Sequence, residues 1–101
     1  MTIEIKRNAN DTVIEITGRL DTITAPVLEN TINENIGSIQ NLILDLKGLE
    51  YISSAGLRVI LGAHKKIQKV GSMKLINVCE VVMEVLEMTG FADIWVIECE
   101  I

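Results

Sequence analysis

Apolar and polar residues alternate at the start of the chain and again a few residues later. Ile3 and Ile5, then Ile14 and Ile16, occupy every second position on either side of the polar segment 8–11. A period of two is typical of a half-buried strand, and the asparagines and aspartate between the two runs tolerate tight turns. The pattern predicts that the chain opens with a β-hairpin.

The spacing of apolar residues then changes to that of a helix. They recur every three or four residues at Ala25, Leu28, Ile32 and Ile36. Thr24 is predicted to accept hydrogen bonds from the free amides of this helix, and Pro26 suits its first turn because amides there have no helical partner. Gly37 is predicted to end the helix.

The middle of the chain carries a short apolar strand and the clearest helix. Residues 42–46 are apolar on both faces, which predicts a central strand covered on one side and nearly covered on the other. From Ser54 to about Val70, one stripe is apolar and basic residues lie away from it. Gly71 is predicted to end this helix.

The remaining elements complete an alternating order. Residues 73–77 are predicted to form a strand, 80–89 a helix closed by Gly90, and 94–101 a last strand. Strand, helix and strand in succession imply right-handed parallel crossovers. The sequence therefore predicts one α/β domain over residues 1–101, with a mixed sheet, packed helices and the order ββαβαβαβ.

Composition narrows the possible functions. The 101 residues carry a net charge of −5 without any basic run, which disfavours nucleic-acid binding. One histidine and two distant cysteines cannot build a catalytic triad or a zinc site, and the glycines form no phosphate-binding loop, so we expect neither an enzyme nor a cofactor. No apolar stretch approaches the roughly 20 residues that span a bilayer. We expect a cytoplasmic protein that does not insert into the membrane.

The remaining candidate for chemistry is a pair of serines at the start of the helix that follows the central strand. Either Ser53 or Ser54 could simply cap the first-turn amides. The same amides, and the positive end of the helix dipole, would also hold a phosphate carried by one of them. Arg58, four residues after Ser54, lies on the same side of the helix and could approach that phosphate, although a solvated charge is its ordinary role.

Three spaced motifs carry a resemblance to a known family. The first is Gly18-Arg-Leu-Asp21, and the second is Tyr51-Ile-Ser-Ser-Ala-Gly-Leu57, which follows a central strand containing Asp45. The third is Leu86-Glu-Met-Thr-Gly-Phe91. Over nearly its full length the chain resembles the STAS domain family, specifically the stand-alone anti-sigma factor antagonists of bacterial partner-switching systems.

The resemblance implies roles for individual residues. The family's phosphate acceptor lies two residues before the glycine of the second motif, which is Ser54 here, with Ser53 as the alternative. Many members carry an aspartate where this chain has Ser53, and Ala55 replaces a serine found in many relatives. Asp21 is implied to lie near the acceptor and contact a partner, or else to serve only as a turn or cap residue. The partner-binding residues implied are Asp21, Thr22, Thr24, Ser53, Ser54, Ala55, Gly56 and Arg58.

The resemblance also implies a mechanism. Unphosphorylated protein would bind an anti-sigma factor that is also its serine kinase and so release a sigma factor. Phosphorylation of Ser54 would reverse the binding, and a PP2C-type phosphatase would restore it. A STAS subunit that docks on a transporter ATPase without being phosphorylated is the first alternative, and a small enzyme or nucleotide-binding protein is the second.

Overall fold

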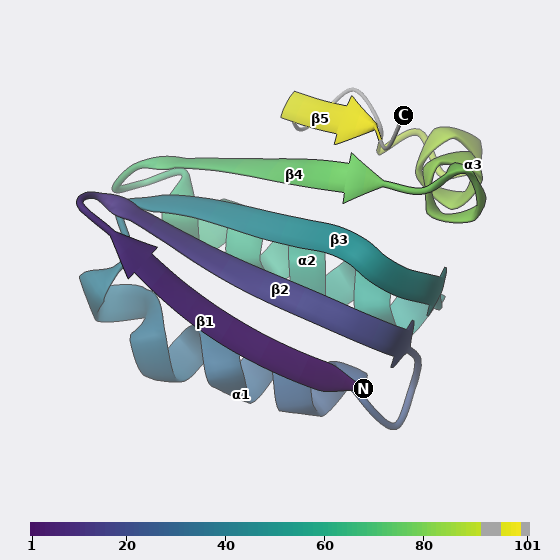
Figure 1. Cartoon of the computed structure of the whole chain (residues 1–101), viewed down its shortest axis with the longest axis horizontal. Coiled ribbons are helices and arrows are strands. Elements are labelled where there is room, and N and C mark those ends of the chain that lie inside the picture. The colour runs from purple at the N-terminus through teal and green to yellow at the C-terminus, as the bar shows by residue number, and fades with distance from the viewer. Residues whose placement is uncertain (92–95, 100–101) are drawn as a thin grey trace.

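The strands form one mixed sheet in the order β1-β2-β3-β4-β5 (Figure 1). The computed structural model describes residues 1–91 and 96–99. Only β1 and β2 pair antiparallel, and every later neighbour is parallel. The strands are β1 (Thr2–Asn8), β2 (Asp11–Leu20), β3 (Asn41–Ile52), β4 (Ser72–Val78) and β5 (Val96–Cys99). The predicted hairpin and the order ββαβαβαβ are confirmed, and positions 94, 95, 100 and 101 of the predicted last strand lie outside the described residues.

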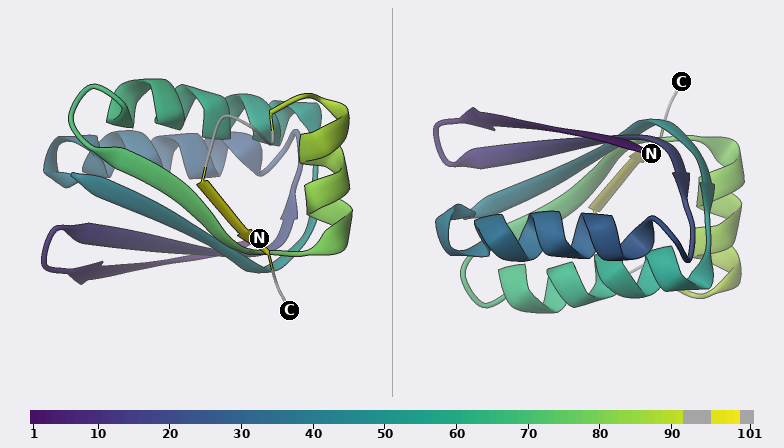
Figure 2. Two further views of the ribbon diagram at one scale, coloured as in Figure 1. Left: turned by 90° about the horizontal axis from the view of Figure 1, so that it is seen from above. Right: turned by 90° about the horizontal axis from the view of Figure 1, so that it is seen from below.

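Two long helices cover one face of this sheet. They are α1 (Ala25–Asn35) and α2 (Ser54–Ile67), which lie side by side in Figure 2. The third helix, α3 (Glu80–Met88), lies at the end of the sheet. The apolar stripes predicted for α1 and α2 are the faces that pack inward, since Leu28, Ile32, Ile60 and Ile67 are buried.

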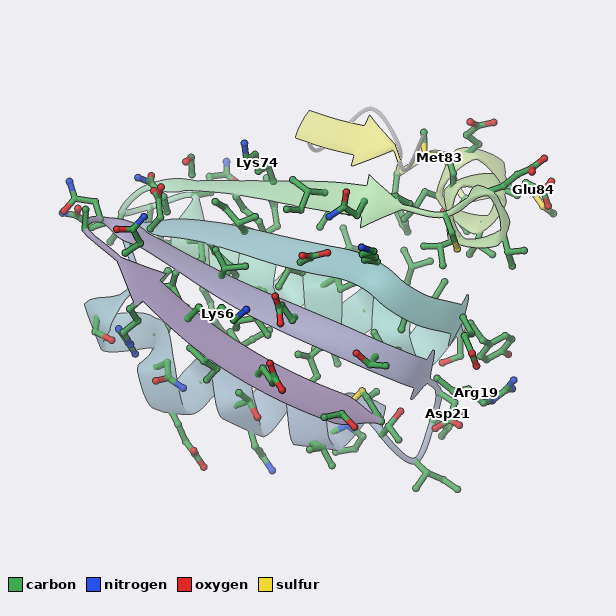
Figure 3. All side chains as sticks on the ribbon, in the orientation of Figure 1. Lys6, Arg19, Asp21, Lys74, Met83 and Glu84 are labelled. Atoms are coloured by element: carbon green, nitrogen blue, oxygen red, sulfur yellow. The ribbon has the colours of Figure 1, made fainter. Side chains whose placement is uncertain are left out.

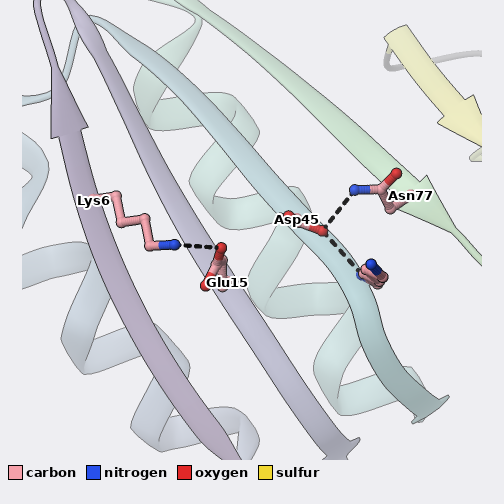
Figure 4. Close-up of polar contacts among 5 residues, drawn as sticks. Lys6, Glu15, Asp45 and Asn77 are labelled. Carbon is pink, nitrogen blue, oxygen red and sulfur yellow. Dashed lines mark hydrogen bonds and ion pairs between the residues drawn. The ribbon is translucent and has the colours of Figure 1, made fainter.

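The β3 strand occupies the centre of the sheet, as its sequence predicts. Leu42, Leu44 and Leu46 are fully buried beneath the helices, whereas Ile43 and Asp45 point to the other face and are half-buried. On that open face, Lys6 Nζ lies 3.1 Å from Glu15 Oε1 (Figure 4). Alternate side chains of one strand therefore serve the core and a polar sheet surface.

The helix ends differ from the predictions at two places. Helix α1 ends at Asn35, and Gly37 lies within a short 3-10 turn, Ile36–Ser38. Helix α2 ends at Ile67 rather than near Val70, because the Ile67 carbonyl accepts the amides of both Val70 and Gly71 and turns the chain toward β4. Gly90 follows α3 with a φ of 79°, a left-handed conformation that confirms it as a helix-ending glycine.

Candidate functional site

The turn between β2 and α1 is organised by the carboxylate of Asp21. A single oxygen, Oδ1, accepts the Ile23 amide at 3.0 Å, the Thr24 amide at 3.0 Å and the Thr24 hydroxyl at 3.1 Å. The Asp21 carbonyl also accepts the first amide of α1, from Ala25, at 2.8 Å. Asp21 is thus the hydrogen-bonding centre of this turn, which agrees with the turn role that the sequence left open.

Thr24 does not cap α1 in the way its sequence position suggests. Its Oγ1 makes no hydrogen bond to the helix amides, but accepts the Asp21 amide at 2.9 Å, and its one proton is shared between the Arg19 carbonyl at 2.8 Å and Asp21 Oδ1 at 3.1 Å. The predicted acceptance of helix amides holds for the Thr24 carbonyl, which accepts the Val27 amide at 3.0 Å and the Leu28 amide at 3.3 Å, but it is wrong for the side chain. Its hydroxyl closes the turn backward because the Asp21 amide competes successfully for the same oxygen.

The hydrogen bonds to Asp21 also set its charge state. The Thr24 amide lowers the pKa of the Asp21 carboxyl below its ordinary value of 3.8 because it stabilises the ionised form. The Thr24 hydroxyl, the Ile23 amide and the Arg19 charge act in the same direction, while desolvation opposes them. Asp21 is a carboxylate at neutral pH, and Figure 3 shows it with Arg19 at the end of the sheet where β2 stops.

The two serines before α2 have different surroundings. Ser53 has extended backbone and is the cap, since its Oγ accepts the Gly56 amide at 3.2 Å and its carbonyl accepts the Leu57 amide at 2.9 Å. Ser54 is the first residue of the helix, and its side chain is exposed. The cap role that the sequence could not assign belongs to Ser53, and the Ser54 hydroxyl is accessible.

Gly56 brings this helix start against the end of β2. A Cβ at Gly56 would lie 2.7 Å from Leu20 Cγ and 3.0 Å from the Leu20 carbonyl oxygen, closer than packed atoms tolerate. The Ser53 amide donates to that same carbonyl at 2.9 Å. Gly56 is buried and acts as a spacer, so the predicted partner residue lies beneath the surface rather than on it.

An open groove of about 230 Å³ joins the starts of α1 and α2. Thr22, Pro26 and Glu29 line it from one side, and Ala55 and Arg58 line it from the other. The structure places Thr22, Ala55 and Arg58, three of the partner-binding residues that the resemblance implies, around one groove, with exposed Ser54 adjoining Ala55. Both arms of the site begin at the carboxyl ends of neighbouring parallel strands, a common place for binding sites in α/β sheets.

Sequence reasoning missed one residue of this region. Ile23 lies between Thr22 and Thr24, and its side chain is 84% exposed. It falls outside the helical stripe that begins at Ala25, so it contributes to no predicted core. An isoleucine between two threonines, outside any apolar period, was the signal that could have identified it.

A second feature beside the site is an aromatic contact. The guanidinium carbon of Arg19 lies 4.2 Å from the centre of the Tyr51 ring, within the range of a cation–π interaction. Arg19 and Tyr51 are the next-to-last residues of β2 and β3 and lie opposite one another in the sheet, so the contact joins the two strands that lead into the groove. Arg19 is also the positive charge that helps to lower the pKa of Asp21.

The described residues offer little to hold a metal ion. Among residues 1–91, whose side chains the structure describes, no three histidine, cysteine or acidic side chains gather in a way that could coordinate one. None of the helices in this part of the chain has the length and apolar character required to cross a bilayer. The arrangement places an exposed serine side chain, a helix start and an open groove beside one another.

Comparison with known proteins finds relatives that match most of this chain. The chain is 34% identical over 93 residues to the anti-sigma-B factor antagonist of Bacillus subtilis, covering 91% of this chain and 85% of the relative. It is 34% identical over 95 residues to the anti-sigma F factor antagonist of Paenibacillus polymyxa, covering 91% and 81%. Both relatives are matched over most of their length.

Solved structures share the fold at lower identity. An anti-sigma factor antagonist from Mycobacterium paratuberculosis superimposes with a TM-score of 0.88 at 21% identity, covering 96% of this chain and 84% of that one. The Bacillus cell fate determinant SpoIIAA in its phosphorylated form gives 0.76 at 20% identity, covering 98% and 93%. The STAS domain family matches residues 2–100. The chain therefore belongs to the STAS domain family.

Proposed function

We propose that this protein is an anti-sigma factor antagonist whose binding is controlled by phosphorylation of Ser54. The observation that carries the proposal is that the two serines differ in their hydrogen bonds and exposure. Ser53 already caps α2, whereas Ser54 is exposed on the first turn of the same helix. The names of the relatives, and the phosphorylated form in which SpoIIAA has been solved, support the same reading.

The proposed effect of phosphorylation is electrostatic. A phosphate adds about −1.5 to −2 charges at neutral pH, and at Ser54 it would meet the positive end of the α2 dipole and Arg58 four residues later. These contacts would stabilise the folded domain when Ser54 is phosphorylated. On the partner's side, the dianion would have to be desolvated against a surface that accepts a neutral serine. Phosphorylation would thus alter what the domain binds while its fold is kept.

The proposed cycle assigns catalysis to other proteins. A cytoplasmic anti-sigma factor that is also a serine kinase would bind the unmodified domain, release its sigma factor and phosphorylate Ser54. A PP2C-type phosphatase would remove the phosphate. The domain itself would need no catalytic group or cofactor, because its role is to present one hydroxyl on a shaped surface.

Binding to purified kinases tests the proposal. Each anti-sigma factor kinase encoded in the host is titrated by calorimetry with wild-type protein, Ser54→Ala and Ser54→Asp. We expect Ser54→Ala to bind as the wild type does and Ser54→Asp to bind roughly tenfold more weakly or worse, since like charges across an interface are costly. Gln40→Glu is the matched control, because Gln40 is exposed and remote from the groove.

The phosphate itself must also be located. Phosphopeptide mapping of the protein from its host in two growth states should find phosphate on Ser54 that changes with the state. Equal binding by Ser54→Ala and Ser54→Asp, or phosphate on Ser53 alone, would contradict the proposal. Absence of binding to every kinase together with co-purification of a transporter ATPase would favour the transporter subunit instead.

A further inference from the structure

The turn before α1 displays an apolar side chain to solvent. Ile23 is 84% exposed, and Val27, four residues later, is 53% exposed. An apolar residue just before a helix cap often packs on the residue at the end of the first turn, which here is Leu28. Leu28 is fully buried, whereas most of the Ile23 side chain is left uncovered by the helix and the rest of the protein.

This exposed side chain sits on a well-fixed backbone. The Ile23 amide donates to Asp21 Oδ1, and the following Thr24 amide donates to the same atom. The Thr24 hydroxyl links the turn to the Arg19 carbonyl at the end of β2. A side chain held in place before binding loses little freedom when a partner covers it, which favours affinity.

We propose that Ile23 is an apolar anchor for the anti-sigma factor and that Asp21 acts as a positioning residue for it. This inference rests on the function proposed above. Asp21 would promote binding by holding the turn that presents Ile23, and its charge would make no contact with the partner. Isoleucine 23 would enter an apolar pocket of the anti-sigma factor, with Val27 at the edge of the contact.

The position of Ile23 relative to the groove identifies this partner. Its neighbour Thr22 lines the groove whose opposite side is formed by Ala55 and Arg58, and Ser54 adjoins that side. One binding partner that covers Ser54 would therefore also reach the turn. The groove is lined by both Glu29 and Arg58, so it carries charges of both signs. An apolar anchor would therefore add binding energy that does not depend on the partner's charge.

The hydrogen bonds to Asp21 make a sharp test possible. All of those that its side chain accepts from the turn fall on Oδ1, and none from the described residues falls on Oδ2. Asparagine keeps an oxygen at Oδ1 and replaces Oδ2 by an amide group. Asp21→Asn therefore preserves the turn and removes the charge, whereas Asp21→Ala removes both.

The experiment uses calorimetry with the anti-sigma factor that binds the wild type. Ile23→Ser should weaken binding roughly tenfold or more, as loss of a buried anchor does. Val70→Ser is the matched control, because Val70 is 62% exposed and lies beside the β1–β2 turn, away from the groove, and it should leave the dissociation constant unchanged. Asp21→Asn should bind within about threefold of the wild type, a difference well below a tenfold step.

A double-mutant cycle separates positioning from a general structural role. Asp21→Ala should weaken binding when it is made in the wild-type protein. The same substitution should weaken binding little further in the Ile23→Ser variant, because both changes act on the same anchor. Circular dichroism and NMR spectra of the backbone amides check that each variant is folded. If Asp21→Ala does not fold, the comparison of Asp21→Asn with the wild type still tests the positioning role.

The outcomes distinguish this inference from the proposed function. If the wild type binds an anti-sigma factor and Ile23→Ser binds equally well, the anchor is refuted while the function stands. If Asp21→Asn loses as much affinity as Asp21→Ala, the charge contacts the partner directly and the positioning role is refuted. If the wild type binds no anti-sigma factor, both the function and the anchor fail.

Discussion

At the scale of single residues, the site depends on side chains whose polar atoms are used inside the protein. Asp21 Oδ1 receives the amides of its own turn, and Ser53 Oγ receives the Gly56 amide. Neither atom is therefore available as a simple surface group. Ser54 differs because its side chain is exposed at the first helical position. Chemistry at this surface can change Ser54 without dismantling the contacts that shape it.

The lowered pKa of Asp21 makes a prediction about acid stability. Because the folded pKa lies below the ordinary value of 3.8, Asp21 stabilises the folded state fully above that value and loses this contribution as pH falls through the lowered pKa. The free energy of unfolding should therefore fall more steeply below about pH 4 in the wild type than in Asp21→Asn. Urea unfolding at several pH values measures both slopes. Parallel curves for the two proteins would contradict this role.

At the scale of elements, the start of α2 joins three parts of the fold. The Ser53 amide donates to the Leu20 carbonyl of β2, and Gly56 allows the helix to approach Leu20 closely. Helix α2 follows β3 directly, so its first turn is held by two neighbouring strands. These contacts hold the helix start that carries Ser54, the residue proposed to be phosphorylated.

Removing the Ser53 cap should weaken this junction. Ser53→Ala should lower the free energy of unfolding by about 0.5–2 kcal/mol, because the Gly56 amide loses its acceptor. Ser53→Asp should retain most of the stability, since aspartate caps as well as serine does. Ser54→Ala, which removes an exposed hydroxyl, is the control and should change stability by less than about 0.5 kcal/mol. Equal losses for Ser53→Ala and Ser54→Ala in urea unfolding would refute the distinction between the two serines.

The same elements explain what the sequence could predict. The hairpin and the helical stripes follow from local periods of two or about 3.6 residues, and the central strand follows from a short apolar run, all of which a single segment contains. The role of Thr24 could not be predicted, because the Asp21 amide and the helix amides compete for one hydroxyl and only the folded turn decides between them. The observed ends of α1 and α2 differ from the predicted ends for a similar reason. Where a helix ends depends on which of its last carbonyls accept amides from the segment that follows.

The candidate site was predictable only in part. The serine pair and Asp21 could be recognised from residue type, position and family resemblance. Predicting the groove would have required knowing that α1 and α2 lie side by side. Predicting how exposed Ile23 is would have required the geometry of the turn. The groove arises between elements that are distant in sequence, so no local pattern encodes it, whereas the position of Ile23 between two threonines was a local signal.

At the scale of the whole molecule, one core supports the site. The buried residues of the sheet and of α1, α2 and α3 form a single cluster, with Leu44 of the central strand fully buried within it. Domains of this size commonly unfold in one cooperative step. The groove should therefore be lost together with the core and not before it.

A substitution at the centre of the core tests this cooperativity. Leu44→Ala should lower the free energy of unfolding by about 2–5 kcal/mol because it leaves a cavity between the sheet and its helices. Circular dichroism and backbone amide signals should report the same urea midpoint, shifted downward. Val70→Ala, at a site 62% exposed, should shift it little. Separate midpoints for the two probes would indicate that the site and the core unfold independently.

The β1–β2 turn at Ala9 and Asn10 lies at the end of the molecule opposite the starts of α1 and α2 (Figure 1). Exposed turns of this kind tolerate inserted sequence better than elements that pack on a core. A fluorophore or an immobilisation tag placed there would leave the groove, Ser54 and Ile23 facing solution. The domain can therefore be used as a biosensor, in which one end is attached to a reporter or a surface while the other end binds its partner.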